Sequence, residues 1–211
     1  MKRIVVATRN AKKLRELKKY LRPLTAEVVS LKEVPAVPHV REDGTTFEAN
    51  ARKKAVAISR FTHGLVLADD SGLEVDALGG APGIKSARFA GPRKSDHDNN
   101  EKILQCLEGV PPAKRTARFV CAIAIADRGH VVATIEEYCT GRIAFALRGQ
   151  YGFGYDPLFL IPSRGKTFGE LGPKVKDRMS HRAKALRKAV RFLKRYIGPR
   201  EDSLSPGGGE G

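Results

Sequence analysis

The 211-residue sequence has no long apolar run and few cysteines. Its uninterrupted apolar stretches fall well short of the ~20 residues that a membrane-spanning helix needs, so we expect no membrane partner. The apolar segment Ile4–Ala7 near the start is also too short for a secretory signal peptide. These two absences favour a soluble, cytoplasmic protein.

The three cysteines, Cys106, Cys121 and Cys139, are odd in number and far apart. This spacing fits neither a disulfide framework nor a zinc site, and it favours a reducing compartment. Because apolar residues flank each cysteine, we expect all three to be small buried side chains.

Acidic residues are few compared with basic ones. The chain has 23 Asp and Glu against 39 Lys and Arg, a net charge of +16 at pH 7. Such a surplus indicates a polyanionic ligand or a strongly solvated basic surface. Nucleotides and nucleic acids both qualify, and composition does not separate them. The length suits one sizeable domain, which we place at residues 1–197, followed by a disordered tail at 198–211.

The most informative stretch runs from Leu65 to Gly91. Leu65–Ala68 is typical of a short buried strand, and it ends on two adjacent carboxylates, Asp69 and Asp70. Successive strand residues point to opposite faces, so one carboxylate can face a cleft while the other turns inward. A turn then leads into a glycine-rich loop, whose N–H groups can approach an anion. The pattern indicates a divalent cation that holds phosphate oxygens; the alternative is an ordinary turn with nothing bound.

A second candidate phosphate site lies near the start of the chain. The strand Ile4–Ala7 is followed by Thr8–Asn10 and then by a helix with an apolar stripe. Asn10 is placed to cap this helix. Lys12 and Lys13 stand in its first turn, where cations oppose the helix dipole but can share an anion with the free N–H groups. The alternative is an ordinary capped helix with a basic solvent face.

Two further segments carry groups that suit a nucleotide. Glu42 precedes a helix for which Thr45 and Glu48 form a capping box, and it is either a metal ligand or a loop acid. Aromatic residues alternate with glycine at 149–157, which suits stacking on a purine or, alternatively, filling a corner of the core.

The last helix is the best defined in the sequence. Apolar residues recur at steps of three and four up to Ile197, and Ser180 is placed as its N-cap. Its other faces are strongly basic and mostly solvated. His181 and Arg182 lie in the first turn, where they can contact a ligand or serve only as local capping groups. Apolar runs at 116–126 and 130–138 predict an antiparallel hairpin, so the chain is expected to form an α/β fold with a mixed sheet.

Four patterns occur in a fixed order along the chain: Thr8-Arg9-Asn10-Ala11-Lys12-Lys13, Ala68-Asp69-Asp70-Ser71-Gly72 continuing to Ala90, Gly152–Pro157, and Met179–Ala183. In this order and at these separations they closely resemble the inosine triphosphate pyrophosphatase family, specifically its bacterial XTP/dITP diphosphatase branch. Each pattern alone is weak, but the ordered set is highly specific and covers the chain from Lys2 to about Tyr196.

The resemblance implies a Mg²⁺-dependent hydrolase that cleaves deaminated purine nucleoside triphosphates (ITP, dITP, XTP) to the monophosphate and pyrophosphate. It also implies an elongated α/β homodimer, with a two-lobed mixed sheet flanked by helices and an active site in the cleft between the lobes.

The resemblance also assigns roles to residues. Asp70 is implied as general base and magnesium ligand, Asp69 as its support, and Glu42 as a second metal-site carboxylate. The implied substrate contacts are Thr8, Arg9, Asn10, Ala11, Lys12 and Lys13 for the triphosphate, Ser71, then Phe153, Gly154, Tyr155 and Asp156 for the base and sugar, with Phe153 stacking, and Lys176, His181 and Arg182 for the nucleobase pocket. Arg9 departs from the family pattern, which has a small residue there; it either adds a phosphate contact or points to solvent.

Two other hypotheses stand beside this one. A basic nucleic-acid-binding module could use the last helix, but it leaves Asp69 and Asp70 without a role, so we do not expect a nucleic-acid partner. A Maf-like pyrophosphatase of related architecture would act on modified pyrimidines or other nucleotides.

Overall fold

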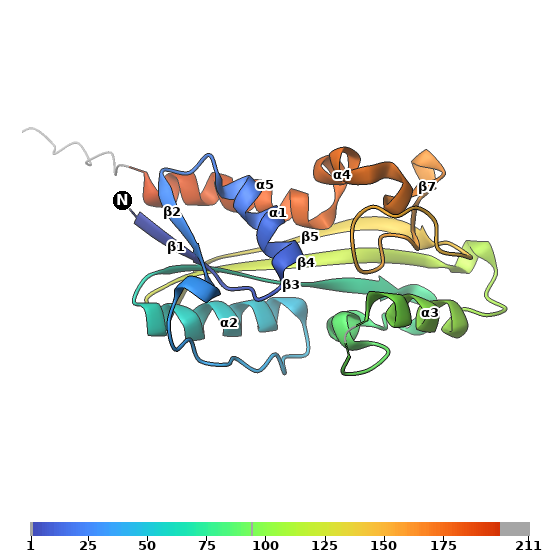
Figure 1. Cartoon of the computed structure of the whole chain (residues 1–211), viewed down its shortest axis with the longest axis horizontal. Coiled ribbons are helices and arrows are strands. Elements are labelled where there is room, and N and C mark those ends of the chain that lie inside the picture. The colour runs from blue at the N-terminus through green and yellow to red at the C-terminus, as the bar shows by residue number, and fades with distance from the viewer. Residues whose placement is uncertain (1, 94, 199–211) are drawn as a thin grey trace, which may run out of the picture.

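The computed structural model describes residues 2–93 and 95–198. A seven-stranded sheet runs through the molecule in the order β2-β1-β3-β4-β5-β6-β7 (Figure 1). β1 pairs in parallel with β2 and β3, and every later pair in this order is antiparallel. The predicted mixed α/β architecture is therefore confirmed. Apart from Gly198, the predicted tail lies outside the described residues.

The bounds of the elements follow the apolar pattern of the sequence. The strands are β1 Lys2–Val6, β2 Ala26–Ser30, β3 Leu65–Val75, β4 Thr116–Asp127, β5 His130–Ile143, β6 Phe159–Ile161 and β7 Lys166–Thr167. The helices are α1 Ala11–Leu21, α2 Phe47–Thr62, α3 Asp96–Cys106, α4 Phe168–Met179 and α5 His181–Ile197. None of the helices in the described part of the chain has the length and apolar character needed to span a bilayer.

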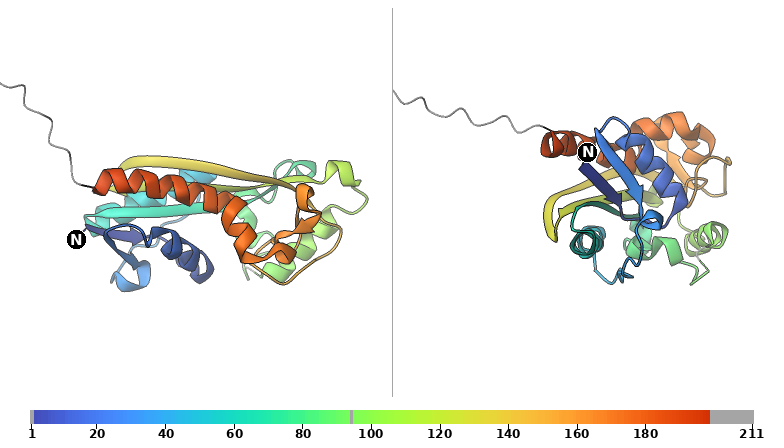
Figure 2. Two further views of the ribbon diagram at one scale, coloured as in Figure 1. Left: turned by 90° about the horizontal axis from the view of Figure 1, so that it is seen from above. Right: turned by 60° about the vertical axis from the view of Figure 1, so that its left-hand side comes forward.

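Helices cover both faces of the sheet, which curves along its length (Figure 2). α1 and α5 pack on one face through residues such as Leu17 and Leu186, against Ile4 and Leu67. α2 packs on the opposite face, where its apolar stripe meets the alternate strand residues, including Val66. The strict alternation of Val66 and Leu67 between the two clusters follows from the two-residue period of a strand.

A third core lies at the other end of the sheet. We call this end the second lobe, and the end that holds the first two cores the first lobe. Ile103 of α3 and Phe168 of α4 pack there with Leu73 of β3 and Phe119 of β4. The long strands β3, β4 and β5 pass through both lobes (Figure 1). Segments far apart in the sequence therefore meet where the lobes join.

Three expectations about local structure are wrong. β3 does not end at Ala68: it continues to Val75, because β4 pairs with it along its whole length and leaves no place for a turn. Thr46, rather than Thr45, caps α2 by accepting a hydrogen bond from Ala49 N. Cys106 is exposed at the end of α3, whereas Cys121 and Cys139 are buried.

The glycine-rich loop after β3 also differs from the prediction. The N–H groups of Gly79 and Gly80 donate to carbonyls within the loop, so they are not available to an anion. Ser86 Oγ accepts from Leu73 N and donates to Gly83 O, which fastens the loop to β3. This hydroxyl comes so close that a Cβ on Gly72 would lie 2.3 Å from it, which is why glycine is needed at that position.

Candidate active site

Asp69 and Asp70 lie in the middle of β3, just beyond the end of β1, and point to opposite faces of the sheet. Asp69 faces the side covered by α1 and α5, where Lys13 Nζ lies 2.8 Å from its Oδ2 and Arg182 Nε lies 3.7 Å away. Asp70 faces α2, where Asn50 Nδ2 donates to its Oδ2 over 3.0 Å. The alternation predicted from the sequence is confirmed, with each carboxylate given its own set of partners.

The two carboxylates differ in charge state. Burial alone would raise the pKa of Asp69, which is 1% exposed, but the nearby cations Lys13, Arg182 and Lys54 lower it to about 2. Burial raises the pKa of Asp70, and Lys13 and Lys54 only partly oppose this effect. Asp69 is therefore a permanent anion that anchors cations, while Asp70 is a more basic carboxylate suited to accepting a proton.

The N-terminus of α1 is capped by Asn10, as the sequence predicts. Asn10 Oδ1 accepts hydrogen bonds from the backbone N–H groups of Lys12 and Lys13, and Thr8 Oγ1 accepts one from Asn10 N. Arg9 is exposed and forms no ion pair or hydrogen bond with residues 2–93 and 95–198. Positive side chains and a helix N-terminus thus converge beside Asp69, as anion binding requires.

The loop before β6 brings an aromatic ring to the same place. Phe153 is partly exposed, and three cations approach its ring: Lys176 Nζ at 4.4 Å, Arg182 Cζ at 5.4 Å and Lys12 Nζ at 5.6 Å from the centroid. Asp156 Oδ2 accepts from Phe153 N over 2.8 Å and fixes the turn of the loop. Gly154 continues this loop at a positive φ, and the hydroxyl of Tyr155 is buried and donates to Ser86 O.

A buried ion-pair network holds the cations near this ring. Lys176 Nζ lies 2.5 Å from Asp156 Oδ2 and 3.7 Å from Glu16 Oε1. Arg182 Nη1 lies 2.7 Å from Glu16 Oε2, and its Nη2 donates to Ser71 Oγ over 2.9 Å. A single α1 carboxylate, Glu16, therefore connects two cations that come from α4 and α5.

His181 lies next to this network but faces the core. It is 3% exposed, and its ring stacks on Phe119 with centroids 4.7 Å apart. Burial and the neighbouring cations, Arg182 first among them, hold its pKa well below the usual value, so the ring is neutral. Its Nδ1 has no hydrogen-bond partner among the described residues.

Glu42 lies close to Asp70, where its charge contributes to the raised pKa of that carboxyl. Its Oε1 lies 2.5 Å from Lys54 Nζ, which itself carries a raised pKa because Asp69, Glu42 and Asp70 outweigh the effect of burial. Three carboxylates thus surround one lysine.

The residues fit a hard divalent cation that is shared with a ligand. No three Asp, Glu, His or Cys side chains in the described ranges form a ready-made metal site. Magnesium at nucleotide sites needs only one or two carboxylates, with waters and phosphate oxygens as the other ligands. Asp70 and Glu42 supply carboxylate oxygens, and the buried Oδ1 of Asp69, which has no hydrogen-bond partner among the described residues, adds to the need for positive charge.

A hollow of 540 Å³ opens beside these groups, lined by Asn10, Ala11, Lys12, Asp96 and Phe153. The structure thus brings together predicted residues from all four sequence patterns, although Arg9 bonds to none of them and His181 turns to the core.

Sequence reasoning missed Glu16, Asn50, Lys54 and Asp96. For Asn50 and Lys54 a signal existed, because they are polar residues four apart beside the apolar stripe of α2.

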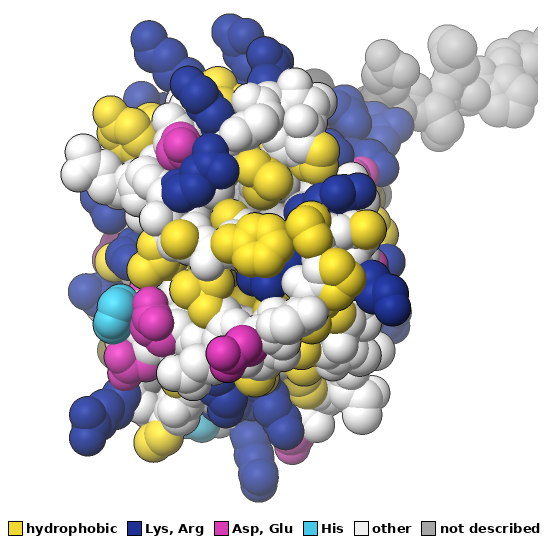
Figure 3. Space-filling view, turned by 90° about the vertical axis from the view of Figure 1, so that its right-hand side faces the viewer, with side chains coloured by type: hydrophobic (Ala, Val, Ile, Leu, Met, Phe, Trp, Pro, Cys, Tyr) yellow, Lys and Arg dark blue, Asp and Glu magenta, His cyan; other side chains and the backbone are white. Residues whose placement is uncertain are grey.

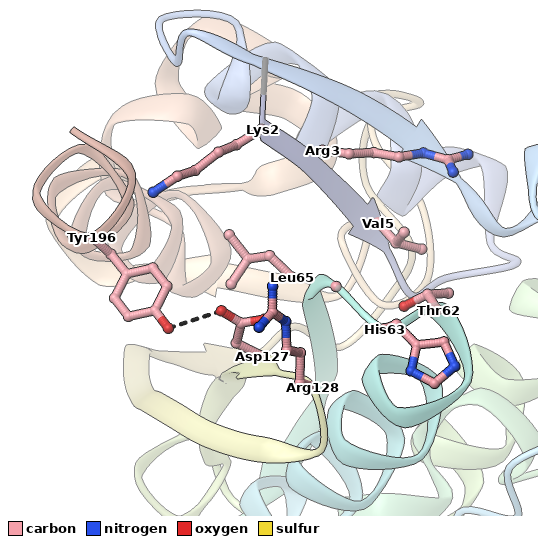
Figure 4. A pocket seen from close by; sticks show the side chains of 10 residues that line it. Lys2, Arg3, Val5, Thr62, His63, Leu65, Asp127, Arg128 and Tyr196 are labelled. Atoms are coloured by element: carbon pink, nitrogen blue, oxygen red, sulfur yellow. Dashed lines mark hydrogen bonds between the residues drawn. The ribbon is translucent and has the colours of Figure 1, made fainter. Parts of the chain in front are cut away.

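A second hollow, of 330 Å³, lies at the opposite end of β1 (Figure 4). Lys2, Arg3, His63 and Arg128 line it, and the hydroxyl of Tyr196 donates to Asp127 Oδ2 over 3.0 Å. The C-termini of α2 and α5 lie here, and cations are favourable at such helix ends. The lining therefore has a structural explanation without a ligand.

Known proteins share the sequence and the fold. Residues 4–192 match the Ham1 family. A protein named dITP/XTP pyrophosphatase from Desulforamulus reducens is 54% identical over 196 residues, which cover 92% of this chain and 98% of the relative. One of the same name from Bacillus subtilis is 45% identical over 193 residues, covering 92% and 98%.

Solved structures agree with these relatives. A HAM1 protein from Coxiella burnetii superposes with a TM-score of 0.86 at 38% identity, covering 92% of this chain and 100% of the other. A nucleoside-triphosphatase, also named dITP/XTP pyrophosphatase, from Mycobacterium abscessus gives 0.75 at 41% identity, covering 90% and 99%. The resemblance predicted from the four sequence patterns is confirmed, and the chain belongs to the Ham1 family.

Proposed function

We propose that this protein hydrolyses deaminated purine nucleoside triphosphates (XTP, ITP and dITP) to the monophosphate and pyrophosphate with Mg²⁺, and so cleanses the nucleotide pool. The observation that carries the proposal is the pair of buried carboxylates Asp69 and Asp70, with Lys13 and Arg182 beside Asp69 and the Phe153 ring beneath Arg182. The names of relatives that are 45–54% identical over nearly their whole length support the same activity.

The phosphate tail lies at the N-terminus of α1. Lys12 and Lys13 neutralise its oxygens, while Thr8 and Asn10 fix the turn before the helix by accepting hydrogen bonds from the backbone N–H groups of Asn10, Lys12 and Lys13. Asp69 holds Lys13 in place and remains charged throughout the physiological range. The ammonium group is thus fixed before the substrate arrives, so little reorganisation is needed during the reaction.

Asp70 accepts a proton from the water that attacks the phosphate. Asn50 Nδ2 and the backbone N–H of Ser71 each bond one of its oxygens, which fixes the carboxylate plane and leaves lone pairs for the water. The bond between the α- and β-phosphates breaks, and pyrophosphate leaves. Asp70, with Glu42 beside it, would hold Mg²⁺, and the bound ion would supply positive charge that neutralises and orients phosphate oxygens.

The purine end lies against Phe153. The ring supplies a stacking face, and Lys176 and Arg182, which lie over the same ring, bring hydrogen-bond donors to the purine. Donors suit O6 of hypoxanthine and xanthine, whereas adenine presents its own amino group there. A donor that faces a donor costs about 1–3 kcal/mol for each group left unpaired. His181 faces the core and supports this pocket from behind.

The testing experiment is pyrophosphate release from a nucleotide panel, with and without Mg²⁺. ITP, XTP and dITP are expected to be cleaved far faster than ATP and GTP, and chelation of the metal should stop the reaction. Equal turnover of all five nucleotides would reject the specificity. Preferential cleavage of a modified pyrimidine nucleotide would instead favour the Maf-like alternative.

A homodimer in the cytoplasm is the proposed working state. Apolar side chains gather on the end face of the second lobe (Figure 3). The segment after β5 carries Phe145, Leu147 and Tyr151, which are 63%, 38% and 52% exposed. Exposed apolar area of this kind favours association with a second copy. Light scattering on the purified protein tests this, because a monomer has a mass of 23.1 kDa and a dimer has twice that mass.

The nucleic-acid alternative is not retained. Several cations of α5 that could contact a phosphate backbone bond within the protein: Lys184 Nζ donates to Tyr138 O, Arg187 bonds the carbonyls of Asp177 and Arg178, and Lys188 pairs with Glu137. This use of charge reduces the free basic surface on the helix.

A further inference from the structure

Asp96 places a carboxylate in the hollow that receives the phosphate tail in the proposed function. It is the first residue of α3, and its Oδ2 lies 2.9 Å from Lys12 Nζ. The same oxygen accepts a hydrogen bond from Gly154 N over 3.0 Å. One carboxylate oxygen therefore joins the cationic start of α1 to the loop that carries Phe153.

The connection between α3 and this loop is reinforced by a buried amide. Asn100 Nδ2 donates to Asp96 O over 2.6 Å and to Gly154 O over 2.8 Å. The Asp96 backbone and the Gly154 loop are thus held together whether or not the Asp96 side chain keeps its charge. What the charge adds is the contact with Lys12.

Capping of α3 does not account for the direction of the Asp96 side chain. Ser95 Oγ already caps the helix by accepting from Asp98 N. Asp98 supplies a second acidic group in the first turn, where a carboxylate favours the helix dipole from solvent. Asp96 instead turns into a hollow with an anion-binding helix N-terminus, and there it takes the place of a ligand anion.

The pair of Lys12 and Asp96 is weak enough to be exchanged. The side chains are 49% and 46% exposed, and ion pairs in such positions contribute only ~0–1 kcal/mol. A polyphosphate carries several negative charges and competes well for the same ammonium group. A singly charged carboxylate can then retake the ammonium when the polyphosphate leaves.

We propose that Asp96 is a positioning residue that acts through Lys12: it holds Lys12 and the Phe153 loop in place in the free enzyme and yields Lys12 to the phosphate tail. This proposal rests on the proposed function, because that function makes a polyphosphate the ligand of this hollow. The carboxylate competes with the ligand, so it weakens polyphosphate binding and favours release of pyrophosphate.

The test is the affinity for inorganic tripolyphosphate, measured by calorimetry in the presence of a chelator so that neither a purine nor turnover is involved. Asp96→Asn keeps an acceptor for Gly154 N and removes the charge. It should bind tripolyphosphate about two- to fivefold more tightly than the unchanged protein at low salt. The difference should shrink toward ~1 M salt, where screening is strong.

Asp98→Asn is the matched control, because it removes the same charge from the same helix turn and its exposed side chain lies outside the hollow. Its effect should be smaller than that of Asp96→Asn at low salt. Equal effects of the two variants, or weaker binding by Asp96→Asn, overturn the proposal.

A double-mutant comparison separates this role from a purely structural one. In a Lys12→Met background, Asp96→Asn should leave the affinity for tripolyphosphate unchanged, because the ammonium group for which Asp96 and the polyphosphate compete is gone. With ITP, Asp96→Asn should lower KM without raising kcat. A persistent gain in the Lys12→Met background, or an unchanged KM with ITP, counts against the mechanism.

The two proposals can fail separately. If the protein binds tripolyphosphate with the expected difference but does not cleave ITP or XTP, only the proposed function is rejected. If ITP is cleaved and Asp96→Asn behaves like Asp98→Asn, only the role of Asp96 is rejected.

Discussion

The two ends of β1 differ in how their charged residues are held. At the end beside the 540 Å³ hollow, Asp69, Asp70, Lys176 and Arg182 are at most 8% exposed, and each has an ion-pair or hydrogen-bond partner. In the hollow of Figure 4, Lys2, Arg3 and Arg128 are exposed. None of these three forms an ion pair with another described residue.

Burial of charge, rather than charge itself, therefore marks the end of β1 where the chemistry is proposed. Taking an ion out of water costs several kcal/mol, and only close partners offset the penalty. A cluster of such ions with shifted pKa values in a cleft is typical of a functional site. The net charge of +16 is a property of the whole chain and does not distinguish the two hollows.

The largest expected effect comes from Asp70→Asn. The amide cannot accept the proton of the attacking water, so turnover of ITP should fall by at least ~10²–10⁴-fold. The fold should persist, because the variant removes a buried carboxylate whose pKa is already raised. Pyrophosphate release and thermal unfolding measure the two properties.

Asp127→Asn is the matched control in the other hollow, where the carboxylate accepts from Tyr196. Its turnover should stay within about twofold of the unchanged protein, as is usual for changes away from a functional site. Equal losses in the two variants would break the distinction between the hollows.

The second effect concerns aromatic rings. Phe153→Ala removes the stacking face in the cleft and should weaken ITP binding by about 1–3 kcal/mol, seen as a higher KM. Tyr196→Ala removes a ring from the other hollow and should leave KM unchanged. A normal KM for Phe153→Ala would mean that the purine stacks elsewhere.

The third effect is a pH dependence of stability. His181 is neutral when folded and has a pKa far below the unfolded value of about 6.5, so the unfolded state binds the extra proton. The free energy of unfolding should therefore fall by up to ~1.4 kcal/mol for each pH unit below about 6.5. His181→Gln should remove this loss, as measured by urea unfolding between about pH 7 and pH 5.

Other buried groups do not obscure that measurement. The contribution of Asp69 is lost only near pH 4–2, because its pKa is lowered to about 2 from an ordinary value near 4. Asp70 and Asp156 have raised pKa values, so they change the free energy of unfolding in the opposite direction as the pH falls. The unchanged protein and the His181→Gln variant both contain these two groups, so their effect cancels in the comparison. His63→Asn, which changes an exposed histidine of the other hollow, should keep the pH dependence of the unchanged protein.

The smallest effect is a gain in stability at the other hollow. Arg128 has a φ of 47° in the hairpin turn and is followed by Gly129 with a φ of 90°. This left-handed backbone favours asparagine followed by glycine, so Arg128→Asn should stabilise the protein by ~0.5–1 kcal/mol. Activity should not change. A loss of activity would show that this turn contributes to the chemistry after all.

Patterns among neighbouring residues in the sequence predicted most of the fold. Strand alternation, the Asn10 and Ser180 caps and the apolar stripe of α5 depend on neighbouring residues, and all of them are confirmed. α4 was missed because Gly172 and Pro173 interrupt it, and Gly172 has a φ of 73° inside the helix. The continuation of β3 depends on pairing with β4, which the residues of β3 alone do not reveal.

The candidate site was predicted in its residue types but not in its network. The four patterns identified the groups that meet, and alternation predicted opposite directions for Asp69 and Asp70. Glu16 and Asp96 were missed because their partners lie far away in the sequence; Arg182, for example, is 166 residues from Glu16. Charged residues on helices are normally solvated, so only the tertiary structure shows which are buried.

The passage of β3, β4 and β5 through both lobes has a consequence for how the molecule can be divided. Each of these strands contributes side chains to the cores at both ends, so a cut through the middle of the sheet exposes apolar surface on each fragment. Neither half can serve as a transplantable module. No interdomain linker separates the two lobes. Any opening between them therefore requires the continuous sheet itself to flex.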